Sequence, residues 1–510
     1  MAVADQTERS EVPSILQSDG PDEVLGRRVI GELFGLPAER SFAVRYWTGS
    51  EEAPPGGAPA FTLVFRRPGT LRRTFLPPSE LTLADEFARG EVDVEGDLEA
   101  AAALPEILAA RLRSPARLAR VVLLLLRLPR DGGPAPGRGP GAGPGLRRML
   151  VRHGRARDAA AIRFHYDIGN DFYQLWLDRR MVYSCGYFPT GLEDLDAAQE
   201  AKLDYVCRKL RLATGERLLD IGCGWGALAL HAVRHYGADA LGITLSPAQA
   251  AHARQQISAE GLEGRCRVEV RDYRDLPHAG GFDKVASVGM FEHVGPRRLQ
   301  RYFEIAARLT RPGGLFLNHG IVTLDHARCH SLGQRLGGRL VRRGEFIGRY
   351  IFPGGELVPL AEALAGAEAA GFETRDVESL REHYAATLRH WRSRLEASRP
   401  AAVAQVGEAT YRVWRLYLAG CAHAFARGSI GIVQMLLAKP DAQGRCALPG
   451  SRRDLYPGPP PTEKSFDPDC FPHRVVVASG LGASAPRPDA RTPTRRQEAS
   501  RHGERSPQPS

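Results

Sequence analysis

The sequence lacks several features that mark common classes of protein. Its eight cysteines are scattered, with no C-x-x-C pair and no Cys/His spacing typical of a zinc site. This distribution argues against a disulfide framework and against a structural metal, and it is typical of a reducing cytoplasm. The first twenty residues are polar and acidic, without the apolar core of a secretory signal. Secretion is therefore not expected.

Long apolar runs are also missing. The longest, residues 121–126, is far shorter than the ~20 residues that a membrane-spanning helix requires. We therefore expect a soluble chain. Charge of one sign is in excess, because 69 Lys and Arg stand against 59 Asp and Glu and give a formal net charge of +10 at pH 7. Such an excess favours an anionic partner, either a nucleic acid or a membrane surface.

Composition divides the chain into five parts. Residues 1–22 are expected to be disordered, and residues 441–510, rich in Pro, Arg and Ser, mostly so. Residues 23–110 predict a small α+β domain, in which 61–65 and 71–76 flank Pro68-Gly69 as a β-hairpin. Within this domain, residues 90–96 precede a helix that begins after Asp97. Residues 111–160 are predicted to form a Gly/Pro-rich linker, and residues 161–440 a catalytic domain.

The predicted linker is strongly basic. Between residues 111 and 157 the chain has twelve arginines, and Asp131 is the only acid. Two interpretations stay open: a solvated linker, or a membrane-facing segment in which each arginine near anionic lipid contributes about 1 kcal/mol. Residues 335–349, with Arg339, Arg342 and Arg343 among hydrophobic residues, offer the same choice between a solvated helix face and a lipid contact.

Strand-like runs alternate with helical stretches in the catalytic region, which predicts a doubly wound α/β sheet. The first run leads into the loop Asp220-Ile-Gly222-Cys-Gly224-Trp-Gly226. Gly222 and Gly224 lack a Cβ, so the backbone can turn sharply against a ligand. The spacing differs from the GxGxxG dinucleotide fingerprint, and no Walker lysine follows. It is similar instead to the first motif of the S-adenosylmethionine (AdoMet) methyltransferases. The five runs are 217–221, 240–244, 267–270, 284–288 and 314–318.

Further segments, in matching order and spacing, resemble one family. It comprises the cyclopropane-fatty-acyl-phospholipid synthases and the mycolic acid cyclopropane synthases. The matching segments are 165–173 (HYDIGNDFY), 181–188 (MVYSCGYF), 218–226 (LLDIGCGWG), 289–295 (GMFEHVG) and 352–355 (FPGG), supported by 383–391 and the stretch from Gly420. The resemblance covers residues 161–439 and implies the Rossmann-like fold of class I AdoMet methyltransferases. More loosely, residues 23–110 resemble the amino-terminal domain of the phospholipid-acting members.

The resemblance also implies how AdoMet is bound. The run at 240–244 ends in Thr244 rather than in the acid with which most AdoMet enzymes bind the ribose diol. The family has a Thr here and a Gln shortly after, which correspond to Thr244 and Gln249. Asp220 ends the first strand, where its carboxylate can anchor the loop or meet a positive or hydrogen-bonding group. The remaining implied contacts are Tyr183, Ser184, Gly222 and Gly224 to the methionine and ribose portions, and Asp272 and Tyr273 beside the adenine.

Methyl transfer to an isolated alkene needs close alignment more than an activated nucleophile. It leaves a carbocation, so water must be excluded and one proton removed from the new methyl group before a ring closes. The resemblance implies a bound bicarbonate as base, whose ligands correspond to Cys185, Glu292, His319, Ile321 and Tyr384. Of these, Cys185 and Ile321 are expected to contribute backbone groups.

The two charged members of this set have an expected place in the fold. His319 follows the apolar run 315–318 and Glu292 follows 285–288, so both are expected at the carboxyl edge of the sheet. An anion beside a glutamate is repulsive, so Glu292 is expected to share a proton with bicarbonate or to be held by His319. Cys185 is not needed as a covalent nucleophile, and His293 is expected to be structural.

Aromatic side chains near these segments offer faces that could stabilise a cation. For each of them, core packing is the alternative interpretation. The residues concerned are Phe164, Tyr166, Phe172, Tyr187 and Phe291.

Together these features predict a cytoplasmic enzyme associated peripherally with the inner face of the membrane. It is expected to transfer a methylene group from AdoMet to the cis double bond of an unsaturated phospholipid acyl chain, forming a cyclopropane ring. A different fate of the same cation would give a methylene-branched, methyl-branched or hydroxylated chain, and the sequence does not separate these outcomes. A small-molecule or nucleic-acid methyltransferase and a non-catalytic lipid-binding protein are the alternatives from other classes. The phospholipid-acting relatives suggest a homodimer, and neither nucleic acid nor metal is expected.

Overall fold

The computed structural model describes residues 20–130, 165–166, 168–277, 281–324, 345–353, 355–446 and 448–456. The predictions made for residues 1–19, 131–164, 335–344 and 457–510 lie outside these ranges. They include Phe164, the Gly/Pro-rich centre of the predicted linker, and the arginines at 339, 342 and 343.

The larger domain is built on one mixed sheet with the strand order β11-β12-β9-β8-β5-β6-β7, and β10 pairs with β9. All neighbouring pairs from β9 to β7 are parallel. The predicted doubly wound α/β sheet is therefore confirmed. The five predicted strands all lie in its parallel part. They are β5 (Arg217–Ile221), β6 (Asp239–Thr244), β7 (Cys266–Val270), β8 (Phe282–Val288) and β9 (Thr310–Thr323).

Three further strands were not predicted. β10 (Val358–Pro359) runs parallel to β9, whereas β12 (Ile430–Ala438) is antiparallel to it, and β11 (Glu373–Ser379) is antiparallel to β12. β12 is buried along almost its whole length, and its apolar run does not alternate in the way that identifies a half-buried strand. These strands widen the sheet beside β9, the strand that carries His319 and Ile321.

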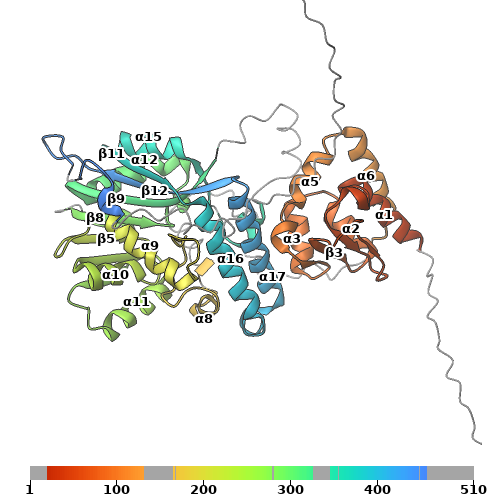
Figure 1. Cartoon of the computed structure of the whole chain (residues 1–510), viewed down its shortest axis with the longest axis horizontal. Helices are drawn as coiled ribbons and strands as arrows, with labels where there is room; N and C mark the ends of the chain where they lie inside the picture. Colours follow the sequence, from red (N-terminus) through yellow and green to blue (C-terminus); the bar gives the residue numbers. More distant parts are fainter. Residues whose placement is uncertain are drawn as a thin grey trace, which may run out of the picture. The chain divides into compact units, whose positions relative to one another are not determined.

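Alternating side chains of the parallel strands point to opposite faces of the sheet, and helices cover each face. Leu218 of β5 packs with α9 (Leu195–Lys209), α10 (Ala227–Tyr236) and α11 (Pro247–Ala259). The next residue, Leu219, packs instead with α12 (Leu299–Leu309) and α15 (Leu360–Ala369). Figure 1 shows α12 and α15 on one side of the sheet and α9, α10 and α11 on the other.

Local capping fixes where the helices near the sheet begin. The Ser246 side chain accepts a hydrogen bond from the amide of Gln249, and Pro247 occupies the first position of α11, where a missing N–H costs nothing. This cap starts α11 three residues after β6 and makes Gln249 the third residue of the helix, within hydrogen-bond distance of Thr244 at the end of the strand. In the same way, Asp194 accepts a hydrogen bond from Ala197 at the start of α9.

Two long helices follow the sheet helices in the chain. α16 (Arg381–Ala397) and α17 (Arg399–Ala426) lie side by side (Figure 1), and α17 is kinked at Gly407, whose φ is 78°. Together with α8 (Asn170–Gln174) they enclose a core that is rich in aromatic rings, including Tyr173, Trp176, Trp391 and Trp414.

The smaller domain is an α+β structure around a four-stranded sheet of order β2-β1-β3-β4. Its strands are β1 (Ala43–Arg45), β2 (Glu51–Glu52), β3 (Phe61–Phe65) and β4 (Val92–Gly96). Its helices are α1 (Pro21–Phe34), α2 (Pro68–Phe75), α3 (Glu80–Ala88), α4 (Leu98–Ala101), α5 (Leu104–Arg111) and α6 (Pro115–Arg127).

Two predictions for this region were wrong. Residues 71–75 form most of α2 rather than the second strand of a hairpin, because Pro68 takes the first helical position and Leu71 and Phe75 share one buried face. β3 pairs instead with β1 and β4. Residues 115–127, predicted as linker, form α6, whose Val121 and Leu125 are buried in this domain's core. The helix expected after Asp97 is confirmed as α4, which Asp97 caps.

Within the described ranges, no helix combines the length and apolarity needed to cross a membrane.

Candidate functional site

The glycine loop after β5 has the left-handed backbone that only glycine adopts without strain. Gly222 has a φ of 80°, and a Cβ built on it would lie 3.0 Å from Cβ of Met290. Its amide donates a 2.9 Å hydrogen bond to the carbonyl of Ile243, which ties the loop to β6. The loop therefore needs glycine for its turn and for the close approach of the segment after β8.

Two cavities adjoin at this loop. Both are lined by Tyr166, Gly222, Gly224, Gln249 and Gly289. The structure thus brings all nine residues predicted to contact AdoMet to the walls of one continuous region. Thr244, Asp272 and Tyr273 line the first cavity, Tyr183, Ser184 and Asp220 line the second, and Gly222, Gly224 and Gln249 line both.

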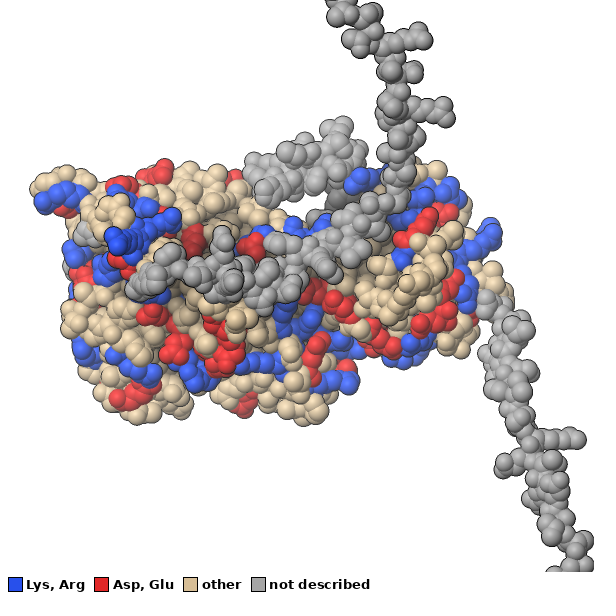
Figure 2. Space-filling model, viewed as in Figure 1, with Lys and Arg blue, Asp and Glu red and all other residues tan. Residues whose placement is uncertain are grey.

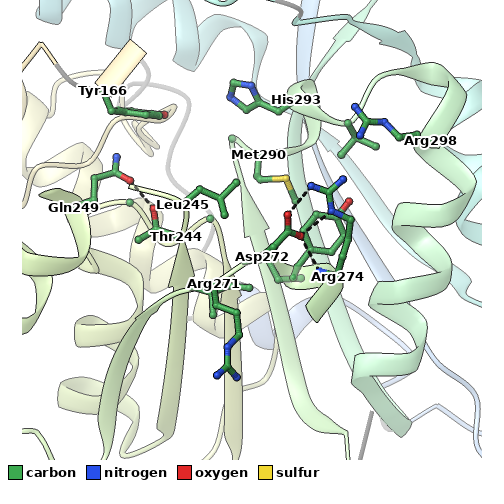
Figure 3. Close-up of a pocket in the computed structure, with 17 residues that line it drawn as sticks. Tyr166, Thr244, Leu245, Gln249, Arg271, Asp272, Arg274, Met290, His293 and Arg298 are labelled. Carbon is green, nitrogen blue, oxygen red and sulfur yellow. Dashed lines mark hydrogen bonds and ion pairs between the residues drawn. The ribbon is translucent and has the colours of Figure 1, made fainter. Parts of the chain in front are cut away.

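The first cavity lies beside the ends of β6 and β8. Thr244 Oγ1 donates a 2.8 Å hydrogen bond to Oε1 of Gln249, so these two side chains form one polar unit on its wall. Figure 3 shows this pair on one side, with Met290 and His293 on the opposite side. His293, expected to be structural, thus also lines the cavity. Sequence reasoning did not single out Met290, which follows the end of β8 on the cavity wall.

Asp272 and Tyr273 form the far wall of the first cavity. The Asp272 carboxylate accepts hydrogen bonds from the backbone amide of Arg274 and from its guanidinium, at 2.9 and 2.5 Å (Figure 3). These hydrogen bonds hold the carboxylate in place and stabilise the turn after β7. The Tyr273 ring meets the Tyr302 ring edge to face, with centroids 5.8 Å apart.

The second cavity holds two buried groups of opposite charge. Asp220, at the end of β5, is 2% exposed, and burial raises its pKa to about 7. Lys202, on α9, is also 2% exposed, and burial lowers its pKa to about 8. Lys202 Nζ donates a 2.9 Å hydrogen bond to Ser184 Oγ. Sequence reasoning missed Lys202; the available signal was its helical spacing from the buried residues Ala198 and Val206.

As predicted, Glu292 lies after the end of β8. It is part of a short 3₁₀ turn and is partly buried. Its Oε1 accepts a 2.7 Å hydrogen bond from the backbone amide of Ile321 in β9. Oε2 is buried and has no hydrogen-bond partner among the described residues. Burial raises the pKa of Glu292 to about 7. The Ile321 amide, expected to face bicarbonate, is thus directed to Glu292 instead.

His319 does not follow the end of its strand, because β9 continues to Thr323. It still lies at the carboxyl edge of the parallel sheet, since it pairs with Val288, the last residue of β8. Its Nδ1 is 3.3 Å from Nε2 of Gln434, and its buried Nε2 has no hydrogen-bond partner in the described chain. Burial lowers the pKa of His319 well below its usual value, so the ring is neutral.

Cys185 and Tyr384 are both buried. Cys185 Sγ donates to the carbonyl of Gly186 at 3.2 Å, and burial raises the pKa of this thiol far above its ordinary range. The thiol is therefore protonated, in keeping with its expected non-nucleophilic character. Tyr384 packs against Trp391 and Phe425, and its phenol pKa is raised by burial and, to a smaller extent, by neighbours that include Glu292.

Aromatic rings crowd the region between the second cavity and α16 and α17. The rings of His165 and Tyr183 stack at 5.5 Å, and Tyr183 lies 5.1 Å from Trp391. Of the aromatic residues predicted to face a cation, Tyr166 lines both cavities. Phe172 and Phe291 are buried in core clusters, and Tyr187 stacks on Tyr205. Core packing thus accounts for these three residues.

Comparisons with known proteins match the chain to one family. The family profile described as mycolic acid cyclopropane synthetase matches residues 153–435. A Pseudomonas putida protein named "Probable fatty acid methyltransferase" is 42% identical over 413 residues, which are 81% of this chain and 95% of that protein. Cyclopropane mycolic acid synthase 1 of Mycobacterium tuberculosis is 37% identical over 281 residues, which are 55% of this chain and 97% of that protein. The solved structure of mycolic acid cyclopropane synthase CmaA1, complexed with SAH and CTAB, is 36% identical with a TM-score of 0.51, covering 55% of this chain and 98% of its own.

Proposed function

Because the chain belongs to the mycolic acid cyclopropane synthetase family and is an AdoMet-dependent methyltransferase of the class I fold, we propose that it methylenates a lipid double bond. The proposed acceptor is the cis double bond of an unsaturated phospholipid acyl chain, and the product is a cyclopropane fatty acyl chain. The observation that carries this proposal is that two polar atoms of the expected base site, Glu292 Oε2 and His319 Nε2, are each buried without a hydrogen-bond partner among the described residues.

The nine residues around the two cavities are proposed to hold AdoMet. The polar unit of Thr244 and Gln249 would bind the ribose, and the turn at Asp272 and Tyr273 would enclose the adenine. Both cavities meet at Gly222 and Gly224, where the absence of side chains lets the backbone approach the ligand.

The alkene supplies the electrons for the reaction. Its π electrons form a bond to the methyl carbon of AdoMet, the carbon–sulfur bond breaks, and S-adenosylhomocysteine leaves. The acyl chain then carries a cation, and loss of a proton from the new methyl group releases the electrons that close the ring. The protein's part is to align the chain, exclude water and offer aromatic faces such as those of Tyr166 and Tyr183.

Two side chains of the predicted base site can donate hydrogen bonds of the kind that hold a small oxyanion. Glu292, with its raised pKa, can donate a proton from Oε2, and neutral His319 can donate from Nε2. Tyr384 and the backbone at Cys185 are the other proposed contacts, whereas the Ile321 amide takes part by holding the carboxyl group of Glu292. A bicarbonate ion, when bound there, would supply the base for proton removal.

Presentation of the acyl chain is proposed to involve α6. Its Leu123 and Leu126 are 60% and 48% exposed, and exposed arginines lie at its last position and within three residues of its two ends: Arg127, Arg113 and Arg130. Figure 2 shows basic side chains at the end of the amino-terminal domain where Figure 1 places α6. Exposed apolar side chains and arginines on one helix and its flanks suit the surface of an anionic bilayer. Association with the inner face of the membrane and a homodimer are part of this proposal.

A second candidate product has one observation in its favour. The Pseudomonas putida relative, which matches over 95% of its length, is named a fatty acid methyltransferase rather than a cyclopropane synthase. A 1,2-hydride shift would move the same cation to the carbon that bears the new methyl group, and loss of a proton from that methyl group would then give a methylene-branched chain. A saturated methyl branch would in addition require an external hydride donor. The cofactor cavities would serve either outcome.

The test is a reconstitution with defined lipid. The purified chain is incubated with AdoMet, bicarbonate and liposomes of a monounsaturated anionic phospholipid, and the acyl chains are analysed by mass spectrometry. The proposal expects a gain of one CH₂ with fragments typical of a ring. The same gain with a surviving double bond would favour the branched product, and no gain on any unsaturated lipid would reject a lipid acceptor.

A further inference from the structure

Gln434 and His319 face each other on neighbouring strands. They are paired in the register of β12 and β9, which lie side by side in the sheet (Figure 1), and both residues are fully buried. Nε2 of Gln434 lies 3.3 Å from Nδ1 of His319. Gln434 is the one polar side chain in the otherwise apolar run of β12. Because a buried amide is costly unless it is hydrogen-bonded, the contact with His319 accounts for a glutamine at this position.

The His319 ring is neutral, so it has one proton for two nitrogens. Burial lowers its pKa, and the ammonium groups of Lys202 and Lys209 lower it further. The nitrogen that holds the proton is determined by the hydrogen bond that the other nitrogen makes. At Nδ1 that partner is the Gln434 amide, whereas Nε2 is buried and has no hydrogen-bond partner among the described residues. The Gln434 amide therefore decides the tautomer of His319.

The two orientations of the Gln434 amide would give Nε2 of His319 opposite roles. In the observed orientation the amide nitrogen faces the ring, so Gln434 donates to Nδ1 and the proton of His319 lies on Nε2. In the reverse orientation the amide oxygen would accept from Nδ1–H, and Nε2 would present a bare lone pair. A lone pair repels an oxyanion, whereas an N–H binds it. The observed orientation thus suits a site for an anion.

We propose that Gln434 is a positioning residue of the base site, which donates to Nδ1 of His319 and thereby keeps the proton on Nε2 as a donor to a bound oxyanion. This inference rests on the base site of the proposed function. Sequence reasoning had assigned Gln434 no role, because β12 was not predicted as a strand. With Nδ1 engaged by Gln434 and Nε2 already protonated, His319 has no free nitrogen lone pair. It therefore holds the base and does not itself take the proton from the new methyl group.

The tautomer is measured on the free protein by nitrogen NMR. The full chain is isotopically labelled at its histidine ring nitrogens, and the His319 signals are identified by their absence from His319→Asn. We expect one tautomer, with the proton on Nε2 and a hydrogen-bonded Nδ1. A proton on Nδ1, or a mixture of both tautomers, would overturn the inference even if the ring-forming reaction occurs. The expected tautomer without product on any unsaturated lipid would support the inference and reject the proposed reaction alone.

Gln434→Met tests the amide itself, because methionine has a similar shape and no N–H donor. The Nδ1 resonance of His319 should move to the position of a ring nitrogen without a hydrogen bond, and the turnover number should fall about 10- to 100-fold. The Kd of S-adenosylhomocysteine should change less than about twofold, because Gln434 is not among the residues that line the cofactor cavities. Gln300→Met, at an exposed position of α12, is the matched control and should change none of these values. An unmoved Nδ1 resonance or an unchanged turnover number in Gln434→Met would overturn the inference.

Discussion

The backbone amide of Ile321 donates a 2.7 Å hydrogen bond to Oε1 of Glu292 and thereby ties this carboxyl group to β9. Oε2 is buried without a hydrogen-bond partner in the described ranges of the chain. Burial raises the pKa of Glu292 to about 7, because water no longer stabilises the charged form. One oxygen is therefore fixed by the fold, and the other is left to interact with a bound group.

Glu292→Gln should abolish most turnover and leave cofactor binding intact. Glutamine keeps an oxygen for the Ile321 amide but cannot give or take the proton. Loss of such a group typically costs about 10²–10⁴-fold in rate. The turnover number and the Kd of S-adenosylhomocysteine are the measurements. Glu362→Gln, at an exposed position of α15, is the matched control and should be neutral. Unchanged turnover of the Glu292 variant would reject the proposed base site.

The same variant should change how stability depends on pH. The pKa of Glu292 is about 7 in the folded chain and near 4.5 when unfolded, so the folded state binds the extra proton between these values. Its contribution to the free energy of unfolding is therefore lost as pH rises from about 4.5 to 7. At one pKa unit per 1.36 kcal/mol, the loss amounts to about 3 kcal/mol. Denaturant unfolding at several pH values should show a steeper loss of stability in the natural chain than in Glu292→Gln, in which the slope from other buried acids such as Asp220 remains. Identical slopes would mean that Glu292 titrates normally.

Gly222→Ala should damage the glycine loop and weaken cofactor binding. The positive φ costs a non-glycine residue roughly 1–2 kcal/mol, and the new methyl group would press on Met290. A lower melting temperature and a weaker Kd for S-adenosylhomocysteine are expected. Gly420→Ala is the control, since a Cβ there meets no atom within 4 Å and the residue lies in helix α17. Equal effects of both substitutions would contradict the account of the loop.

Leu123→Ser combined with Leu126→Ser should reduce binding to anionic vesicles. These side chains are exposed on α6, and burying a leucine side chain is worth about 1.5–3 kcal/mol, so the loss should exceed about tenfold. Co-sedimentation with phosphatidylglycerol vesicles gives the affinity. Leu192→Ser is the control, because Leu192 is 69% exposed and lies outside α6. If the control weakens binding as much as the α6 variant, the contact is not at α6.

Sequence reasoning located the parallel strands because each is a short apolar run followed by turn residues. It missed β12, whose apolar run does not alternate and so resembles a buried helix segment, and β11, whose alternating residues lie at the sheet edge. It placed Pro68-Gly69 in a turn, although the proline begins α2. These errors share one cause, because packing against distant elements decides between local conformations of similar energy.

The candidate site was predicted residue by residue from the resemblance of its motifs. All nine residues predicted to contact AdoMet line the two cavities. Lys202 was not predicted as a site residue, because a lysine on a helix normally faces solvent. Its ammonium group is hydrogen-bonded to Ser184 and lines a cavity together with Asp220, and these two residues come from a loop and a strand elsewhere in the chain. No local pattern indicates that juxtaposition.

The central claim is that a methyl group of AdoMet becomes the ring methylene of an acyl chain after losing one proton. It is tested most directly with AdoMet whose methyl group is fully deuterated, supplied with monounsaturated phospholipid vesicles. The account predicts a product in which two of the three deuterons remain, on a ring carbon, and the double bond is gone. A product that keeps all three deuterons on a methyl branch would contradict it.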